Sequence, residues 1–199
     1  MENIECLTVK DFLVQIALPT FPGPASGSVS ATTAAMAASL LEMGIKITMR
    51  KDEKQCSLAK NLDYIENIRA QCISLATEDI EAYQEVIKAS KSRKTHPEEF
   101  EVAMKNATET LVAIVRYSNI IITELEHLIN TSYIKVLGGD LGGSAYMAEA
   151  AAAAAKLGVE INLRLIQDES YKTKKLKSIN ENYENCVETK ERILSMINN

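Results

Sequence analysis

Tryptophan is absent from this sequence, and the residues that make tight turns are scarce. Its 199 residues include only 8 glycines and 4 prolines, and aromatic residues make up 5% of the chain. Sandwiches and barrels need many short strands joined by turns, so this composition argues against them. No segment shows sustained alternation of apolar and polar residues either. The sequence therefore favours an all-α protein.

Cysteines and histidines with metal-site spacing are also lacking. The four cysteines form no C-x-x-C pair: Cys6, Cys56, Cys72 and Cys186. This spacing argues against a structural zinc site and a disulfide framework, and it favours a reducing compartment. Glu124 and His127 have the E-x-x-H spacing of di-iron bundles, but that site needs the motif twice. We expect no metal ion.

The sequence has neither a basic face nor a membrane-spanning run. Lysine and arginine number 22 against 27 acidic residues, for a net charge of −5, so nucleic acid is not an expected partner. The N-terminal segment MENIECLTVK lacks the pattern of a signal peptide. The most apolar window, 28–45, is alanine-rich and contains Glu42. We expect a cytoplasmic protein that does not enter a membrane.

Helical periodicity dominates the rest of the chain. Apolar residues recur at steps of three and four, and capping residues and prolines mark the helix ends. The pattern predicts helices over about 8–18, 26–49, 57–89, 95–130, 145–166 and 169–197. No linker or repeat divides the chain. We therefore predict one domain over residues 1–199, an up-and-down bundle of long antiparallel helices.

Two of the predicted helices have almost no side-chain bulk, and each follows a glycine-bearing loop. The first reads FPGPASGSVSATTAAMAASLL (21–41), and the second reads GGDLGGSAYMAEAAAAAAKLG (138–158). In one interpretation the small residues let two central helices pack closely, and the glycines only make turns. In the other, loop amides and helix N-termini bind an anionic or flat ligand. Composition alone does not separate these interpretations.

Three stretches together resemble the C-terminal family of the formiminotransferase-cyclodeaminases. PASGSVSA (24–31), with the small-residue helix after it, resembles the family's P-G-G-G-S-V-A-A opening. EDIEAYQEVIKA (78–89) resembles D-x-E-A-F-x-x-V, and the segment 138–165 resembles a later stretch whose asparagine matches Asn162. The resemblance covers about residues 8–170. In the first stretch the matching positions are Pro24, Gly27, Ser28, Val29, Ala31, Met43, Thr48 and Lys51.

The resemblance implies an enzyme that acts on the bridge between N5 and N10 of tetrahydrofolate. A formimidoyltetrahydrofolate cyclodeaminase closes N10 onto the formimino carbon and releases ammonia. A methenyltetrahydrofolate cyclohydrolase adds water to the methenyl carbon to give 10-formyltetrahydrofolate. The resemblance also implies a tetrahydrofolate derivative as substrate, no cofactor, and a homodimer. Either reaction needs a carboxylate near the cationic carbon.

Asp140 is the first candidate for that carboxylate, because it stands in the second glycine loop. A turn aspartate that bonds to its own backbone explains it equally well. Asp79, on the third predicted helix, matches a family position and is the second candidate. We expect the two glycine loops to face one another and form one pocket. The expected substrate-binding residues are Pro24, Gly27, Ser28, Lys51, Gly139, Gly143 and Ser144.

The sequence also departs from the family pattern. Ala25 and Ser26 stand where the family has glycines, and Ser144 stands where it has an acidic residue. These departures motivate a second hypothesis, a non-catalytic folate-binding or assembly subunit with the same fold.

Overall fold

The structure is a computed structural model that describes residues 4–51, 57–132 and 134–198; Cys56 lies outside these ranges. The described residues form helices and no strand, which confirms the all-α prediction. None of these helices is long and apolar enough to cross a membrane. The elements are η1 (Ile4–Cys6), α1 (Val9–Ala17), α2 (Ser26–Lys51), α3 (Ser57–Ser92), α4 (Pro97–Ser132), η2 (Lys135–Leu137), α5 (Gly138–Leu163) and α6 (Glu169–Asn198).

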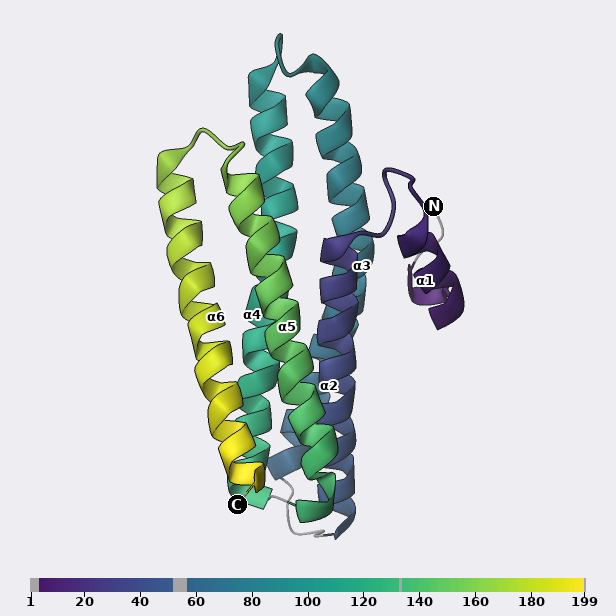
Figure 1. The fold of residues 1–199 in the computed structure, drawn as a ribbon, viewed down its shortest axis with the longest axis vertical. Coiled ribbons are helices and arrows are strands. Elements are labelled where there is room, and N and C mark those ends of the chain that lie inside the picture. Colours follow the sequence, from purple (N-terminus) through teal and green to yellow (C-terminus); the bar gives the residue numbers. More distant parts are fainter. Residues whose placement is uncertain (1–3, 52–56, 133, 199) are drawn as a thin grey trace.

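Helices α2, α3, α4 and α5 form a bundle in which each helix packs against the next, and α5 packs back onto α2 (Figure 1). Helix α6 packs against α4 and α5 on the outside of this bundle. Consecutive helices run in opposite directions, so α2 and α4 point one way while α3 and α5 point the other (Figure 1). The predicted up-and-down arrangement is confirmed.

Small residues let α2 and α5 approach closely at the centre of the bundle. Each helix buries five alanines: Ala31, Ala34, Ala35, Ala37 and Ala38 on α2, and Ala145, Ala148, Ala151, Ala152 and Ala155 on α5. Ser144 Oγ on α5 donates a hydrogen bond to the Ala37 carbonyl oxygen at 2.8 Å. A short side chain can reach the backbone of a neighbouring helix only when the helices lie close together. The close packing of these segments is therefore confirmed. The idea that the glycines only make turns is wrong, because Gly27 lies in α2 and the glycines from Gly138 to Gly143 lie in α5.

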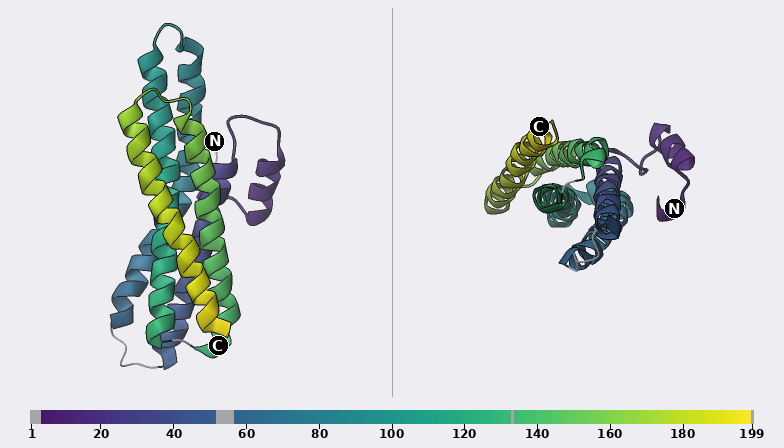
Figure 2. Two further views of the ribbon diagram at one scale, coloured as in Figure 1. Left: turned by 60° about the vertical axis from the view of Figure 1, so that its left-hand side comes forward. Right: turned by 90° about the horizontal axis from the view of Figure 1, so that it is seen from below.

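Helix α1 lies at the side of the bundle rather than within it (Figures 1 and 2). Thr8 caps it, because Thr8 Oγ1 accepts a hydrogen bond from the Asp11 backbone N–H at 3.1 Å. Phe12 is its buried residue, whereas Val9 and Leu13 are exposed. The helix thus presents apolar side chains to solvent.

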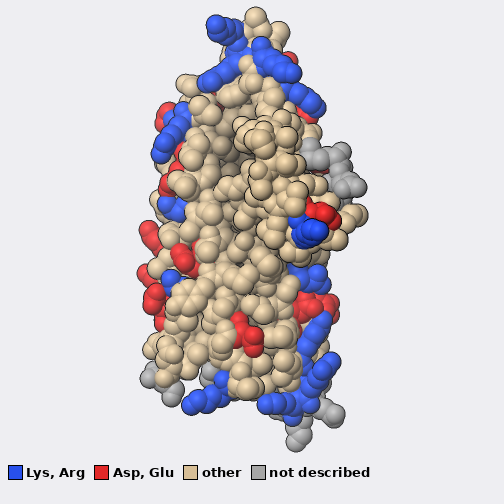
Figure 3. All heavy atoms as spheres, turned by 45° about the vertical axis from the view of Figure 1, so that its right-hand side comes forward, with Lys and Arg blue, Asp and Glu red and all other residues tan. Residues whose placement is uncertain are grey.

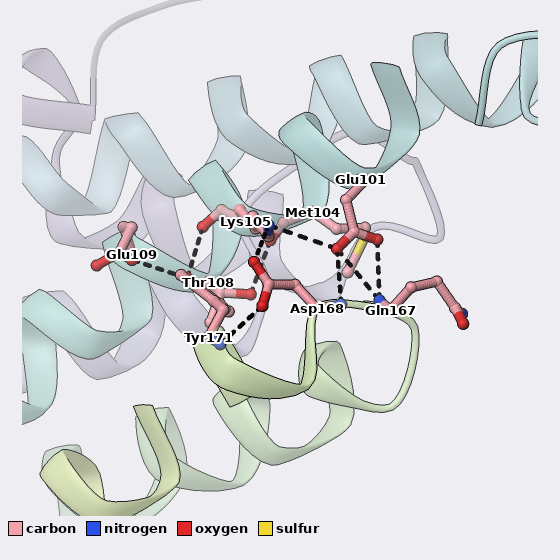
Figure 4. A network of polar contacts seen from close by, with 8 residues as sticks. All are labelled: Glu101, Met104, Lys105, Thr108, Glu109, Gln167, Asp168 and Tyr171. Atoms are coloured by element: carbon pink, nitrogen blue, oxygen red, sulfur yellow. Dashed lines mark hydrogen bonds and ion pairs between the residues drawn. The ribbon is translucent and has the colours of Figure 1, made fainter. Parts of the chain in front are cut away.

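A network of charged residues ties the connection between α5 and α6 to α4 (Figure 4). The Glu101 carboxylate on α4 accepts hydrogen bonds from the backbone N–H groups of Gln167 and Asp168. Lys105 Nζ donates to Asp168 Oδ2 at 2.8 Å, and the Tyr171 hydroxyl donates to Glu109 Oε1 at 2.7 Å. These contacts hold the C-terminal end of α5 in place.

Candidate functional site

A cavity of about 250 Å³ lies beside the first turn of α2, where that helix meets α3, α4 and α5. Small and apolar side chains form most of its wall, and Asp79 supplies its carboxylate. This combination suits an organic ligand that presents one cationic or proton-bearing group. The lining residues are Phe21, Gly23, Ala25, Ser26, Gly27, Asp79, Tyr83, Ala107, Leu111, Ala154, Gly158 and Asn162.

Asp79 projects from α3 toward the N-terminus of α2. Ser28 Oγ donates a hydrogen bond to Asp79 Oδ2 at 3.0 Å, and the Ser28 backbone N–H also donates to the carboxylate. Burial raises the pKa of Asp79, while the two bonds from Ser28 lower it, and the net pKa lies above the ordinary value of 3.8. A carboxyl group shifted in this direction gains and releases a proton closer to neutral pH.

Gly27 allows this close approach of Asp79 to α2. A Cβ atom at position 27 would lie 2.0 Å from Asp79 Oδ1, far inside van der Waals contact. Ala25 and Ser26, which replace two family glycines, are exposed at the cavity instead. Of the three glycine positions of the family pattern, the one that this chain keeps, Gly27 in the first turn of α2, is therefore the one that the carboxylate approaches.

The structure brings together three of the residues predicted from the sequence. Gly27 and Asp79 line the cavity, and Ser28, which is fully buried and does not line it, bonds to Asp79. Pro24 is buried two residues before the start of α2. This grouping favours Asp79, the second of the two carboxylate candidates.

The prediction that the two glycine loops face one another is wrong. Helices α2 and α5 are antiparallel, so Gly27 lies near Gly158 at one end and Gly44 lies near Leu141 at the other. The two helix N-termini are therefore separated by roughly the length of α2, which is about 39 Å for its 26 residues at 1.5 Å per residue. The reason for preferring Asp140 is thereby removed.

The remaining predicted residues lie toward that other end. Helix α5 begins at Gly138, so Gly139, Asp140 and Gly143 belong to its first two turns rather than to a loop. Asp140 is exposed there, as is Lys51 at the end of α2. Ser144 is fully buried and bonds to the α2 backbone. None of these five residues lines the cavity beside Asp79.

The chain is similar to known folate enzymes over nearly its whole length. The family model described as Formiminotransferase-cyclodeaminase matches residues 8–181. The chain belongs to this family. The crystal structure of formiminotetrahydrofolate cyclodeaminase from Thermotoga maritima superimposes with a TM-score of 0.91 at 27% identity, covering 98% of each chain. Methenyltetrahydrofolate cyclohydrolase from Methylorubrum extorquens is 26% identical over 182 residues, covering 86% of each chain.

Several residues that line the cavity were not predicted from the sequence. Phe21, Tyr83, Gly158 and Asn162 line the cavity but were not among the predicted site residues. Asn162 did carry a signal, since it matches an asparagine of the family pattern. Tyr83 carried one too, since it stands at the phenylalanine of the pattern D-x-E-A-F-x-x-V. Phe21 carried none, because a single aromatic residue in a loop is ordinary.

Proposed function

We propose that this protein is a folate one-carbon enzyme that acts on the N5/N10 bridge of tetrahydrofolate. The reaction is the formimidoyltetrahydrofolate cyclodeaminase or the methenyltetrahydrofolate cyclohydrolase reaction. The observation that carries the proposal is the partly buried Asp79 carboxylate in an otherwise small and apolar cavity, in a chain of this family. We propose the cytoplasm as its location, since the described cysteines Cys6, Cys72 and Cys186 are free thiols.

Asp79 has the chemistry that either reaction needs. In the cyclohydrolase reaction its carboxylate would stabilise the cationic methenyl carbon and accept a proton from the attacking water. In the cyclodeaminase reaction N10 would bond to the formimino carbon and its proton would pass to the imine nitrogen, which becomes an amino group. The Asp79 proton would then go to this amino group, so that it leaves as ammonia and the bridge becomes the methenyl cation. We assign Gly27 to the substrate-binding wall. Ser28 would act through its bonds to Asp79, and Pro24 would shape the chain before them. Neither reaction draws on a cofactor.

A wider groove of about 520 Å³ between α3 and α4 suits this chemistry less well. Its carboxylates, including Glu85 and Glu99, are exposed to solvent. Exposed carboxylates attract a bound cation only weakly, because water and salt screen their charge.

Two assays of the purified protein test the proposal. Loss of the methenyl absorbance of 5,10-methenyltetrahydrofolate reports the cyclohydrolase reaction, and ammonia release from 5-formiminotetrahydrofolate reports the cyclodeaminase reaction. We expect enzyme-dependent turnover in one of them. Absence of turnover in both would contradict an enzyme of this type.

The departures from the family pattern favour a second candidate, a non-catalytic folate-binding or assembly subunit. Ser144 stands where the family has an acid, and the structure buries it against Ala37. Calorimetry with 5-formyltetrahydrofolate, a stable analogue, separates the two candidates. Binding without turnover supports the subunit, and absence of binding excludes both.

We further propose that the protein is a homodimer that pairs through the outer face of α2 and α5. The segment of α2 from Ser26 to Leu41 contains no charged residue. Charged side chains gather mainly at the edges and ends of this side of the molecule, and most of its middle is uncharged apart from an acidic group in the lower part (Figure 3). An apolar face of this kind is typical of an interface. Its exposed side chains include Val29, Met36, Tyr146, Leu157 and Ile161.

Light scattering tests the homodimer. A dimer has twice the chain mass of 21.9 kDa, and Met36→Glu, which puts a charge in the middle of the face, should reduce the mass to that of one chain. Val102→Glu is the matched control, because Val102 is an exposed apolar residue on α4 away from this face. A single-chain mass for the unaltered protein at micromolar concentration would exclude the homodimer.

A further inference from the structure

Two aromatic rings stand together at the cavity beside Asp79. Phe21, in the segment before α2, and Tyr83, one turn after Asp79 on α3, both line the cavity. Their ring centroids are 6.4 Å apart and the rings meet edge to face at 63°. This geometry is a favourable one for an aromatic pair.

Neither ring is needed to fill the protein core. Phe21 is 73% exposed and Tyr83 is 45% exposed, whereas most apolar side chains of the bundle are buried. Exposing a phenylalanine to water costs free energy that its burial would recover. An exposed pair of rings at the wall of a cavity is therefore available to a ligand.

The chain before α2 is built to hold Phe21 in this place. Pro22 and Pro24 restrict the backbone on its C-terminal side, and Pro24 is buried. At Gly23 the backbone passes so close to Thr20 that a Cβ atom would lie 3.0 Å from the Thr20 carbonyl oxygen. A restrained backbone presents the ring at a lower entropic cost than a flexible one.

The α4 and α5 side of the cavity leaves room for a flat group. Ala107, Ala154 and Gly158 line it with little side-chain volume. A Cβ atom at Gly158 would lie 2.8 Å from Leu111 Cδ1, so any larger residue there would crowd the Leu111 side chain that also lines the cavity. The cavity thus has aromatic rings from α3 and its neighbouring segment, and small residues from α4 and α5.

We propose that Phe21 and Tyr83 bind the flat heteroaromatic ring system of the substrate by stacking and edge contacts. This inference rests on the proposed function, and it assigns to these two residues a binding role rather than a part in proton transfer. Substitutions that remove a ring should weaken ligand binding and raise KM, while kcat changes little, because the contact is made equally in the ground state and the transition state.

Calorimetry with 5-formyltetrahydrofolate provides the test. Phe21→Leu and Tyr83→Leu should each raise Kd about three- to tenfold, the effect of losing one aromatic contact. Tyr83→Phe keeps the ring and should bind within twofold of the unaltered protein. Tyr64→Leu is the matched control, because Tyr64 is equally exposed on the same helix but does not line the cavity.

Each outcome has a distinct meaning. If the unaltered protein binds the analogue and the two leucine variants bind it equally well, the ring-binding role is wrong and the proposed function stands. If the unaltered protein does not bind the analogue, the proposed function and this inference both fail. A Phe21→Leu variant that loses affinity together with its dimer mass or melting temperature would assign Phe21 to assembly or folding and overturn its role here.

Discussion

Gly27 and Asp79 approach each other so closely that no side chain fits between them. A Cβ atom on Gly27 would lie 2.0 Å from Asp79 Oδ1 and 2.4 Å from its Cγ atom. The carboxylate from α3 therefore lies directly against the first turn of α2, where backbone N–H groups are unpaired within the helix. The same contact caps the helix and places a carboxyl group in the cavity wall.

A Gly27→Ala substitution should displace the Asp79 side chain. Alanine is a better helix former than glycine by about 1 kcal/mol, but the overlap with the carboxylate cannot be relieved unless Asp79 leaves Ser28. We expect turnover to fall by about a hundredfold, as for other misplacements of a reacting group. Initial rates and a thermal melt of the same sample measure the two effects.

Gly139→Ala is the control for that variant. A Cβ atom at Gly139 would meet no heavy atom within 4 Å, so this helical glycine should accept alanine with unchanged turnover and unchanged or slightly higher stability. Equal losses of activity in both variants would show that the Gly27–Asp79 contact has no special importance.

Ser28→Ala should raise the pKa of Asp79 further. The Ser28 hydroxyl donates to the carboxylate and so favours its ionised form, which lowers the pKa. Without this bond, the limb of the pH–rate profile that reports Asp79 should move to higher pH. Ser30→Ala is the matched control, because the buried Ser30 hydroxyl donates to the Ser26 carbonyl oxygen and not to Asp79. A profile that is the same for both variants would show that Asp79 is not the titrating group.

Helix positions could be predicted from the sequence with small errors. The predicted helix 57–89 is α3 (Ser57–Ser92), and the predicted helix 169–197 is α6 (Glu169–Asn198). Apolar residues at steps of three and four, with Pro19 and Pro97 near helix ends, determine these boundaries locally. The larger error is at α5, which begins seven residues before the predicted 145, because Gly138–Ser144 were interpreted as a loop.

The error about Asp140 came from topology rather than from local pattern. In an up-and-down bundle the direction of the chain reverses at each helix, so α2 and α5, three helices apart, must begin at opposite ends. The similar composition of the two helix starts hid this constraint. The cavity instead combines the start of α2 with the end of α5, at Gly158 and Asn162, and such a long-range pairing has no local signal in the sequence.

The described cysteines should differ sharply in reactivity. Burial raises the pKa of the Cys72 and Cys186 thiols to about 12, and nearby Glu149 adds to the effect at Cys186. At neutral pH neither forms the reactive thiolate, whereas Cys6 is exposed. Brief iodoacetamide treatment followed by peptide mass spectrometry should find Cys6 alkylated and Cys72 and Cys186 intact until the protein is unfolded. Rapid alkylation of Cys72 in the folded protein would contradict its place in the core.

Asp79→Asn and Asp140→Asn should separate the two carboxylate candidates by activity. Removal of a positioned acid–base group typically costs a hundredfold or more in rate, so we expect that loss for Asp79→Asn and a near-normal rate for Asp140→Asn. The asparagine at position 79 keeps the shape of the side chain and an oxygen that can accept from Ser28. The opposite ranking of the two variants would return the carboxylate to Asp140.

The same pair of variants should differ in how their stability depends on pH. The pKa of Asp79 is raised in the folded protein above the ordinary value of 3.8, so the folded state binds the proton more tightly than the unfolded state does. The stabilising contribution of Asp79 is therefore present at low pH, is lost as pH rises from about 3.8 toward the folded-state pKa, and stays lost above it.

Asp79→Asn cannot titrate, so relative to the unaltered protein its free energy of unfolding should increase across that window. Asp140→Asn keeps the Asp79 carboxyl group and should therefore lack this gain. Urea titrations of all three proteins at several pH values from 4 to 8 measure the differences, and a constant difference between Asp79→Asn and the unaltered protein would show that the Asp79 carboxyl has an ordinary pKa.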